Sequence, residues 1–596
     1  MYKIIIILIF LFFTVNSSFS QLSPKRELRG AWIATFSNID WPIRTQTPLQ
    51  QRNAFLLILD NLKSSGINTV FVQVRSQCDA MYASSIEPWS ADLTGVQGQA
   101  PNPFWDPMTF MIEECHKRNI EFHAWLNPYR AISNFAVINT FASNHVARQR
   151  PEWLLSSGAL RTLDPGLPAV RNYILDIVKD IVTRYDIDGL HFDDYFYPNS
   201  VFDDNSSFTS NARGFTDRAD WRRDNVNIMV QSVNDAIKLI KPWVKFGISP
   251  TGIYRNSTNP AIGTPTAGLE HYTSLFADSK KWIEQGWVDY LAPQVYWFIG
   301  QSGADYSRIV PWWNNQANNK HIYIGLAGYK VNDANLGQPS WLSNTQIPEQ
   351  IRFSRNYNNI QGQIFYNTKS LMNNPLNFRD SLQQRLYNKP ALVPAMPWKD
   401  NVKPNSPRLL TAAKYTKDSL VLTWLADNVL TGELNIAKKY VIYKSLTVPI
   451  NINNPDNILA IIPSNATKFA DLNLDNNNYN YAVSALDRLS NESDLSNSVS
   501  TLTSSIDDDI ILISDVLLYP NPTKTQFNIK LNDKTKGLVI VKIYNLQGAL
   551  IHSQSQKVNG NSELKIDMHN EIEIGIYMVE IKTSNNAFTR KIIIIQ

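Results

Sequence analysis

Cysteine is almost absent from this chain, which has 596 residues but only Cys78 and Cys115. Two cysteines cannot form the kind of disulfide framework that stabilises small secreted domains. Neither cysteine lies in a motif that would activate a catalytic thiol. Stability must therefore come from packed cores, and a content of 43% hydrophobic residues is sufficient for several globular domains.

The chain also has no large excess of positive or negative charge, because the net charge is only +4 and no long block of Lys or Arg occurs. The composition therefore gives no indication of a nucleic-acid partner. The chain has no His-Glu-x-x-His motif, no Gly-rich phosphate loop and no Gly-x-Ser-x-Gly motif. We accordingly expect neither a metal nor a cofactor, and no metalloprotease, nucleotide or serine-hydrolase chemistry.

The long apolar run of the sequence lies at its N-terminus, where residues 4–13 are unbroken hydrophobic residues. This run is too short to cross a bilayer. Lys3 precedes it, and Ser18 and Ser20 flank a cleavage site before Gln21. The pattern predicts a signal peptide at residues 1–20, with no transmembrane span in the mature protein.

Eight short apolar runs recur along residues 25–390, and a helical pattern follows each of them. Runs of this kind are typical of parallel strands that are buried on both faces. Strands that alternate with helices eight times predict an α/β fold of the (β/α)₈ barrel type. The runs are 29–35, 69–75, 121–128, 187–193, 245–252, 289–297, 321–329 and 363–367.

The remainder of the chain changes from helical to alternating patterns. Several prolines predict a linker at residues 391–405. Residues 406–503 contain short strands rich in Tyr and Trp, and they resemble a fibronectin type III β-sandwich. Residues 515–596 predict a second small all-β sandwich.

Two adjacent carboxylates, Asp193 and Asp194, end the fourth apolar run and precede an aromatic loop. Catalytic residues of such barrels lie at the carboxyl ends of the strands. Adjacent carboxyls repel, so one of them can remain protonated and act as a general acid on a glycosidic bond. Alternation along the strand points Asp193 into the mouth, and Asp194 only if the strand end twists or bulges. The pair also fits a loop cap or a metal ligand.

Other strand ends supply polar and aromatic residues that suit sugar hydroxyls and sugar rings. Tyr296 is a candidate to assist catalysis. His191 shares a face with Asp193, although a strand histidine also fits a hydrogen-bonded core position. The candidate substrate-binding residues are Arg75, Asn127, His191, Gln294, Ser249, Trp125, Trp297 and Tyr129.

Six stretches occur in an order that resembles the "family 10-like" glycosyl hydrolases of bacterial envelopes. The resemblance implies a barrel and glycan hydrolysis, with some members acting on peptidoglycan strands stripped of peptides. The stretches are 29–32, 73–75, 124–128, 188–195, 247–250 and 293–297.

The spacing Asp188-Gly189-x-x-x-Asp193 also resembles the motif of family 18 chitinases, in which an Asp orients the substrate's acetamido group as the nucleophile. Tyr296 falls where those enzymes keep a tyrosine. Tyr195 stands where they place the acidic Glu, so Asp194 would have to supply the proton here.

The last eighty or so residues resemble the C-terminal sorting domain of the type IX secretion system. This resemblance implies passage through the periplasm, recognition by the secretion machinery, and a secreted or cell-surface protein. The motifs that carry it are residues 518–522, 541–548, 575–579 and 590–596.

Three hypotheses remain open at this point. The first is a glycoside hydrolase acting on an N-acetylhexosamine-containing glycan, with peptidoglycan strands as one candidate. The second is an inactive glycan-binding surface protein. The third is a two-carboxylate glycosidase on a neutral polysaccharide, which needs another acid roughly 5 to 9.5 Å away, with Asp79 or Glu270 as the loop candidates.

Overall fold

The computed structural model describes residues 23–416, 418–426, 432–501, 516–521, 523–531, 535–545, 548–560, 562–568, 575–583 and 587–594. The predicted signal peptide therefore lies outside the described residues. The chain divides into two compact units. The first contains residues 1–407, 426–464 and 481–496, and the second contains residues 408–425, 465–480 and 497–596.

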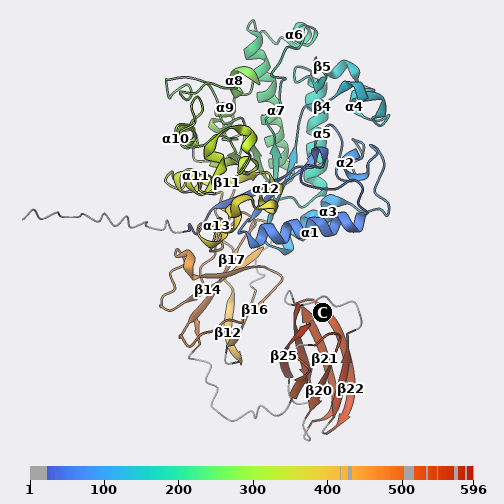
Figure 1. Cartoon of the computed structure of the whole chain (residues 1–596), viewed down its shortest axis with the longest axis vertical. Coiled ribbons are helices and arrows are strands. Elements are labelled where there is room, and N and C mark those ends of the chain that lie inside the picture. The colour runs from blue at the N-terminus through green and yellow to red at the C-terminus, as the bar shows by residue number, and fades with distance from the viewer. Residues whose placement is uncertain are drawn as a thin grey trace, which may run out of the picture. The chain divides into compact units, whose positions relative to one another are not determined.

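The first unit contains the predicted (β/α)₈ barrel, a closed sheet of parallel strands in the order β1-β11-β10-β9-β8-β7-β3-β2 (Figure 1). Every one of the eight predicted runs overlaps a barrel strand. The strands are β1 (Leu28–Ile33), β2 (Thr69–Arg75), β3 (Glu121–Leu126), β7 (Gly189–Phe192), β8 (Lys245–Ile248), β9 (Tyr290–Leu291), β10 (His321–Ala327) and β11 (Ile360–Tyr366).

Helices follow the strands around the barrel, and their starts reflect local sequence. The first begins with a capping box in front of Pro48: the Thr47 hydroxyl accepts from the Gln50 N–H, and the Gln50 side-chain oxygen accepts from the Thr47 N–H. The α-helices of the barrel are α1 (Pro48–Ser64), α2 (Ala91–Thr94), α3 (Pro107–Lys117), α4 (Val146–Gln149), α5 (Pro168–Arg184), α6 (Asn205–Asn211), α7 (Arg218–Ile240), α8 (His271–Ser274), α9 (Ser279–Glu284), α10 (Tyr306–Asn315), α11 (Gln346–Ser354), α12 (Thr368–Asn373) and α13 (Phe378–Gln384).

The barrel lumen is filled by large side chains. Its core cluster includes Trp32, Phe71, Trp125 and Tyr290, all buried. Two glycines make room for this packing. A Cβ at Gly189 would lie 2.5 Å from the His123 ring, and one at Gly247 would lie 2.1 Å from the Tyr290 ring. The lumen is therefore a packed core, and substrate can reach only its rim.

The segment predicted as a linker packs against the barrel. Met396 is fully buried within the lumen cluster. Trp398 and Lys399 both bond the carboxylate of Asp289, at 2.9 Å each. Proline content indicated only that this segment is irregular, whereas the burial of Met396 shows that it closes the amino-terminal end of the barrel.

A small antiparallel sheet is inserted between β3 and α5. Its strands are β4 (Arg130–Ile132), β5 (Leu154–Ser157) and β6 (Leu160–Leu163), with β6 in the middle. Arg130 pairs with Thr162 across this sheet. The insertion thus fixes the backbone of the chain directly after the strand that ends at Leu126.

The predicted β-sandwich at residues 406–503 contributes strands to both units. In the first unit the order is β15-β14-β17, and in the second it is β12-β13-β16. The boundaries of this module remain a prediction. The strands are β12 (Arg408–Thr416), β13 (Ser419–Leu425), β14 (Lys439–Ser445), β15 (Ile458–Pro463), β16 (Lys468–Asp471), β17 (Asn480–Leu486) and β18 (Val499–Ser500).

The C-terminal strands form two antiparallel sheets around one apolar core, as expected for a small all-β domain. One sheet has the order β19-β20-β23 and the other β22-β21-β24-β25. The strands are β19 (Val516–Tyr519), β20 (Gln526–Leu531), β21 (Lys536–Asn545), β22 (Leu550–Asn559), β23 (Glu563–Asp567), β24 (Gly575–Lys582) and β25 (Ala587–Ile594). Within the described residues, no helix has both the length and the apolar character needed to cross a bilayer.

Candidate active site

Asp193 and Asp194 lie together just beyond the carboxyl end of β7. The Asp193 N–H still donates to the Leu126 carbonyl of β3 (3.2 Å), but the Asp194 N–H turns back to the Asp193 carboxylate (2.9 Å). The chain then turns, since the Phe196 N–H donates to the Asp194 carbonyl (3.0 Å). Because the strand has ended at Phe192, strict alternation no longer separates the two side chains.

The two carboxyls have different electrostatic environments. Burial raises the pKa of Asp193, but hydrogen bonds from the Asp194 residue and the charge of Arg130 act in the opposite direction. Burial raises the pKa of Asp194 well above its usual range, and the neighbouring Asp193 charge raises it further. The pair shares its protons, and these surroundings favour the proton on Asp194 and the negative charge on Asp193.

Gln294 joins this pair to the core beneath it. Its Nε2 donates to the Ser249 carbonyl (2.9 Å) and lies 3.4 Å from Asp193 Oδ1. A side-chain hydrogen bond from Gln294 also lowers the pKa of Asp194, against the larger effects that raise it. Gln294 itself is half-buried. Through these contacts it holds the carboxyls in place at the rim of the mouth.

One buried donor close to the pair, the Asn127 amide nitrogen, has no hydrogen-bond partner among the described residues. The Asn127 oxygen faces Gln73 Nε2 at 3.4 Å, which orients the amide. The Trp125 indole is directed to the pair instead, since a hydrogen bond from it lowers the pKa of Asp193. An unpaired buried donor is costly, so a ligand oxygen at Asn127 would be favourable.

Three tyrosines form an aromatic group at the same rim. Tyr296 stacks with Tyr366 at 6.0 Å between ring centroids, and Tyr329 packs edge-on against both, at 6.0 and 5.7 Å. The Asp193 and Asp194 charges both contribute to the raised pKa of Tyr296, after burial and its tyrosine neighbours. Trp297 is half-buried beside Gly252 in the loop after β8.

Four of the predicted binding residues support the site from below, without a free surface for substrate. Arg75 is fully buried, and all five of its N–H groups are used within the protein, including a bidentate pair with Glu87 at 2.8 Å. Tyr129, His191 and Ser249 are also buried. The Arg75 guanidinium holds the carbonyls of Asn127 and Pro128, and a direct contact between Arg75 and sugar stays a prediction.

The loop acids Asp79 and Glu270 serve their own loops. Asp79 accepts from Ser76 and Gln77, each at 3.2 Å. Glu270 accepts from the Asn256 N–H at 2.7 Å. These contacts engage each acid within its own loop, so they lend no support to a two-carboxylate arrangement with either acid.

Sequence reasoning missed three residues at the mouth: Arg130, Tyr366 and Asp40. Tyr366 could have been found, because it lies near the end of the eighth apolar run and is the last residue of β11. Arg130 follows a strand end by four residues, at the start of the small inserted sheet. Burial raises the pKa of Asp40 to about 6, although the Ala34 and Lys369 N–H groups both donate to it at 2.7 Å. Nothing in the local sequence of Asp40 distinguishes it from a loop residue.

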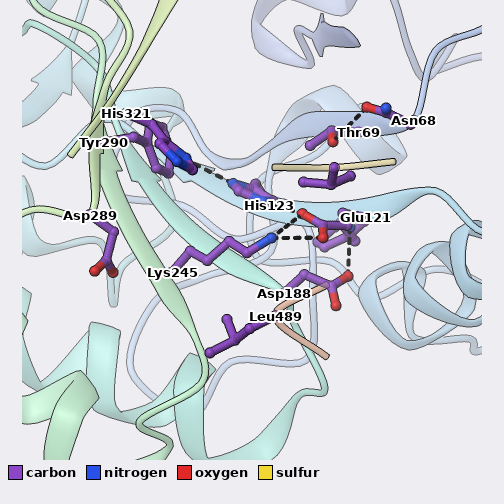
Figure 2. Close-up of polar contacts among 12 residues, drawn as sticks. Asn68, Thr69, Glu121, His123, Asp188, Lys245, Asp289, Tyr290, His321 and Leu489 are labelled. Carbon is purple, nitrogen blue, oxygen red and sulfur yellow. Dashed lines mark hydrogen bonds and ion pairs between the residues drawn. The ribbon is translucent and has the colours of Figure 1, made fainter. Parts of the chain in front are cut away.

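A second polar cluster lies at the opposite, amino-terminal end of the barrel (Figure 2). Lys245 reaches both oxygens of Glu121 at 2.7 and 2.6 Å, and both side chains are buried. Asp188, at the start of β7, bonds His116 at 2.8 Å and the Phe122 N–H at 2.8 Å. These ion pairs are internal, so the Asp188 of the chitinase-like spacing is structural.

A chain of hydrogen bonds crosses the lumen between the two ends. The Trp32 N–H can only donate, so His191 Nε2 accepts it (3.4 Å) and His191 Nδ1 donates to Tyr290 (3.1 Å). The Tyr290 hydroxyl then donates to His123 Nδ1 (2.9 Å), and His123 Nε2 faces Glu121 (3.4 Å). Burial lowers the pKa of both histidines, which agrees with this neutral, ordered arrangement.

Within the described part of the chain, no group of three or more His, Cys, Asp or Glu is placed to hold a metal ion. The geometry of the mouth is instead that of a carboxyl pair, an unpaired donor and aromatic rings. Such a site suits a polyhydroxylated ligand.

Comparison with known proteins gives two matches to families. Residues 27–343 match the family described as glycosyl hydrolase-like 10, and residues 517–595 match the secretion system C-terminal sorting domain. The second match indicates export to the cell surface or beyond.

Curated relatives agree with the first match. The chain is 40% identical to "Glycosyl hydrolase YngK" of Bacillus subtilis over 78% of this chain and 92% of that protein. It is 39% identical to "Glycosyl hydrolase DigH" of Escherichia coli over 54% of this chain and 78% of that protein. The solved PgaB (BpsB) glycoside hydrolase domain from Bordetella bronchiseptica covers 61% of this chain and 99% of its own, with 13% identity and a TM-score of 0.42.

The family match covers more than half of the chain, and the Bacillus relative aligns over nearly its whole length. The barrel and the placement of the carboxyl pair at its mouth are consistent with that relationship. The chain therefore belongs to the glycosyl hydrolase-like 10 family, and it is a glycoside hydrolase.

Proposed function

We propose that the enzyme cleaves a glycan containing N-acetylhexosamine, with peptidoglycan strands as a candidate substrate, by acid catalysis at the mouth of the barrel. The observation that carries this proposal is the unequal environment of two adjacent carboxyls. Asp194 is favoured as the protonated partner and Asp193 as the ionised one. Enzymes that break glycosidic bonds need one carboxyl in each state.

In the proposed reaction, Asp194 donates its proton to the glycosidic oxygen as the bond from that oxygen to the anomeric carbon breaks. Asp193 either orients the acetamido group, whose oxygen attacks the anomeric carbon, or attacks it directly. Tyr296 and Gln294 assist by positioning the reacting groups. Asn127 supplies a free donor to a sugar oxygen, Trp125 donates to Asp193, and the tyrosine rings supply a stacking surface.

The test compares Asp194→Asn with Asp193→Asn on two substrates. Asp194→Asn should lower kcat by about 10²-fold or more on an unactivated glycan, because Asn cannot donate a carboxylic proton. On an aryl glycoside, whose leaving group needs no proton, the loss should be much smaller. Asp193→Asn should reduce turnover of both substrates alike. Full activity of Asp194→Asn on the natural glycan would place the acid elsewhere.

A second candidate function is glycan binding without turnover. Tyr195 occupies the position at which chitinases carry their acidic Glu, and it is exposed at the rim. This reading expects normal glycan binding by both Asn variants and no turnover of any substrate by the wild type. Mass spectrometry of products from a panel of glycans separates the two functions.

We also propose that the type IX secretion machinery recognises the C-terminal domain and exports the enzyme from the periplasm. A sorting signal needs only to be recognised, so truncation before Asp515 should leave hydrolysis intact in the purified protein. In cells, the truncated protein should remain in the periplasm. Loss of activity in the purified truncation, or its normal export, would contradict this proposal.

A further inference from the structure

Arg130 is held rigidly at the rim of the mouth. It opens β4, and its backbone pairs with Thr162 of β6. The guanidinium carbon lies 4.4 Å from the centre of the Phe36 ring and 4.9 Å from that of the Tyr195 ring. Two aromatic rings therefore fix the plane of the guanidinium, and cation–π attraction holds it there.

The terminal nitrogens of Arg130 have no use within the described part of the chain. Its Nε donates to the Ser76 carbonyl at 3.1 Å, and no other side-chain hydrogen bond or ion pair of Arg130 occurs there. The side chain is half-buried. Arg75, the last residue of β2, provides the contrast, since every one of its donors is satisfied.

The guanidinium lies over Tyr195, the residue that directly follows the carboxyl pair, at the same rim of the barrel. Its charge lowers the pKa values of Asp193, Tyr195 and Tyr366. It also lowers the pKa of Asp92, and it forms no ion pair with any of these groups within the described residues. A cation so near the reacting groups, with two free nitrogens, is positioned to receive an anion that the protein itself does not supply.

We propose that Arg130 is a specificity-determining residue that binds a free carboxylate on the substrate glycan, next to the bond that is cleaved. This inference rests on the proposed function and names the substrate class of the same site: an acidic glycan. The planar fork of Arg matches the two oxygens of a carboxylate, and such charged hydrogen bonds are stronger than those to sugar hydroxyls. A neutral glycan would leave the fork unfilled.

The experiment measures the ratio of kcat/KM between two forms of the same glycan. A general loss of activity in a variant affects both forms equally and cancels in this ratio. Two acidic glycans, peptide-free peptidoglycan strands and hyaluronan fragments, are each compared with the same glycan after its carboxylates are reduced to alcohols. The wild type should prefer at least one acidic form by about tenfold or more in kcat/KM, the size expected for hydrogen bonds to a charged group. Arg130→Gln should remove that preference, and Arg130→Lys should keep part of it.

Arg161 supplies a matched control. It lies on β6 of the same small sheet and over an aromatic ring, with its guanidinium carbon 4.1 Å from the centre of Phe135. Arg161→Gln should leave the preference unchanged. An equal preference in the wild type and Arg130→Gln would overturn the inference while leaving the proposed hydrolysis intact.

Failure of the proposed function gives a different result. If the wild type turns over none of these glycans, the same ratios are measured as equilibrium affinities by calorimetry. Tighter binding of an acidic form by the wild type, lost in Arg130→Gln, would support the inference alone. Absence of any preference in binding would overturn it.

Discussion

The two ends of the barrel contain the same kinds of group in opposite electrostatic states. At the amino-terminal end, burial alone would raise the pKa of Glu121, but Lys245 holds it at about 2. Asp289, paired with Lys399, also has a lowered pKa despite burial. At the mouth, Asp193 and Asp194 lie beside each other with no ion pair, and both pKa values are raised.

The difference separates carboxyls whose charge the fold compensates from carboxyls whose charge it leaves uncompensated. A buried carboxylate and its cationic partner satisfy each other's charge and hydrogen bonds, so neither group remains available to a ligand. The carboxyls at the mouth retain a proton, a charge and unpaired neighbours, which is a cost to stability that a substrate can offset. Burial alone does not distinguish the two ends of the barrel, because the charge of the neighbouring group decides whether the pKa of a buried carboxyl is lowered or raised.

The largest expected effect comes from removing the cation at the amino-terminal end. Lys245→Met leaves Glu121 buried without its partner, and should lower the free energy of unfolding by about 3–5 kcal/mol. Tryptophan fluorescence during urea unfolding measures it. The double variant Glu121→Leu/Lys245→Met, which removes both charges, should recover most of the loss. Equal stability of Lys245→Met and wild type would show that this pair does not support the barrel.

A pH series should show opposite trends for the two ends. The lowered pKa of Glu121 gives stability that is present above its ordinary value of 4.5 and lost as the pH falls towards 2. That loss is about 3 kcal/mol, and the double variant should lack it. The raised pKa of Asp194 gives stability that is present below 3.8 and lost as the pH rises through the raised value.

Asp194→Asn should therefore become more stable relative to the wild type as the pH increases from 5 to 8. Thermal unfolding at each pH measures both trends. A constant difference between Asp194→Asn and wild type across this range would mean that the mouth carboxyls are not shifted in the direction described.

The smallest effect concerns the hydrogen-bond chain between the ends. Tyr290→Phe removes the hydroxyl that joins His191 to His123, and should lower kcat by only a few-fold, in addition to a stability cost of roughly 1–3 kcal/mol for unpaired buried groups. Tyr323→Phe is the control, because within the described residues its hydroxyl bonds only His321 Nδ1 (2.8 Å), two residues away on the same strand, β10. An equal effect of both variants on kcat would show that the chain has no influence on the mouth.

Sequence alone predicted most of the fold. Buried parallel strands are continuous apolar runs, and eight of these alternating with helices leave few alternatives to a closed barrel. The capping box at Thr47 and the antiparallel pattern of the C-terminal strands are likewise local signals. The carboxyl pair was found for the same reason, since Asp193 and Asp194 directly follow an apolar run.

Only the tertiary structure decided what each polar residue does. Arg75 ends one barrel strand and Arg130 follows another, yet Arg75 is saturated by Glu87 and backbone carbonyls while the terminal nitrogens of Arg130 stay free between two rings. Glu121 and Asp194 are both acids at strand ends, and only Lys245, which lies 124 residues from Glu121, sets their states apart. The physical reason is that hydrogen bonds and charge pairs depend on distances between segments remote in sequence, whereas strand and helix patterns depend on neighbours along the chain.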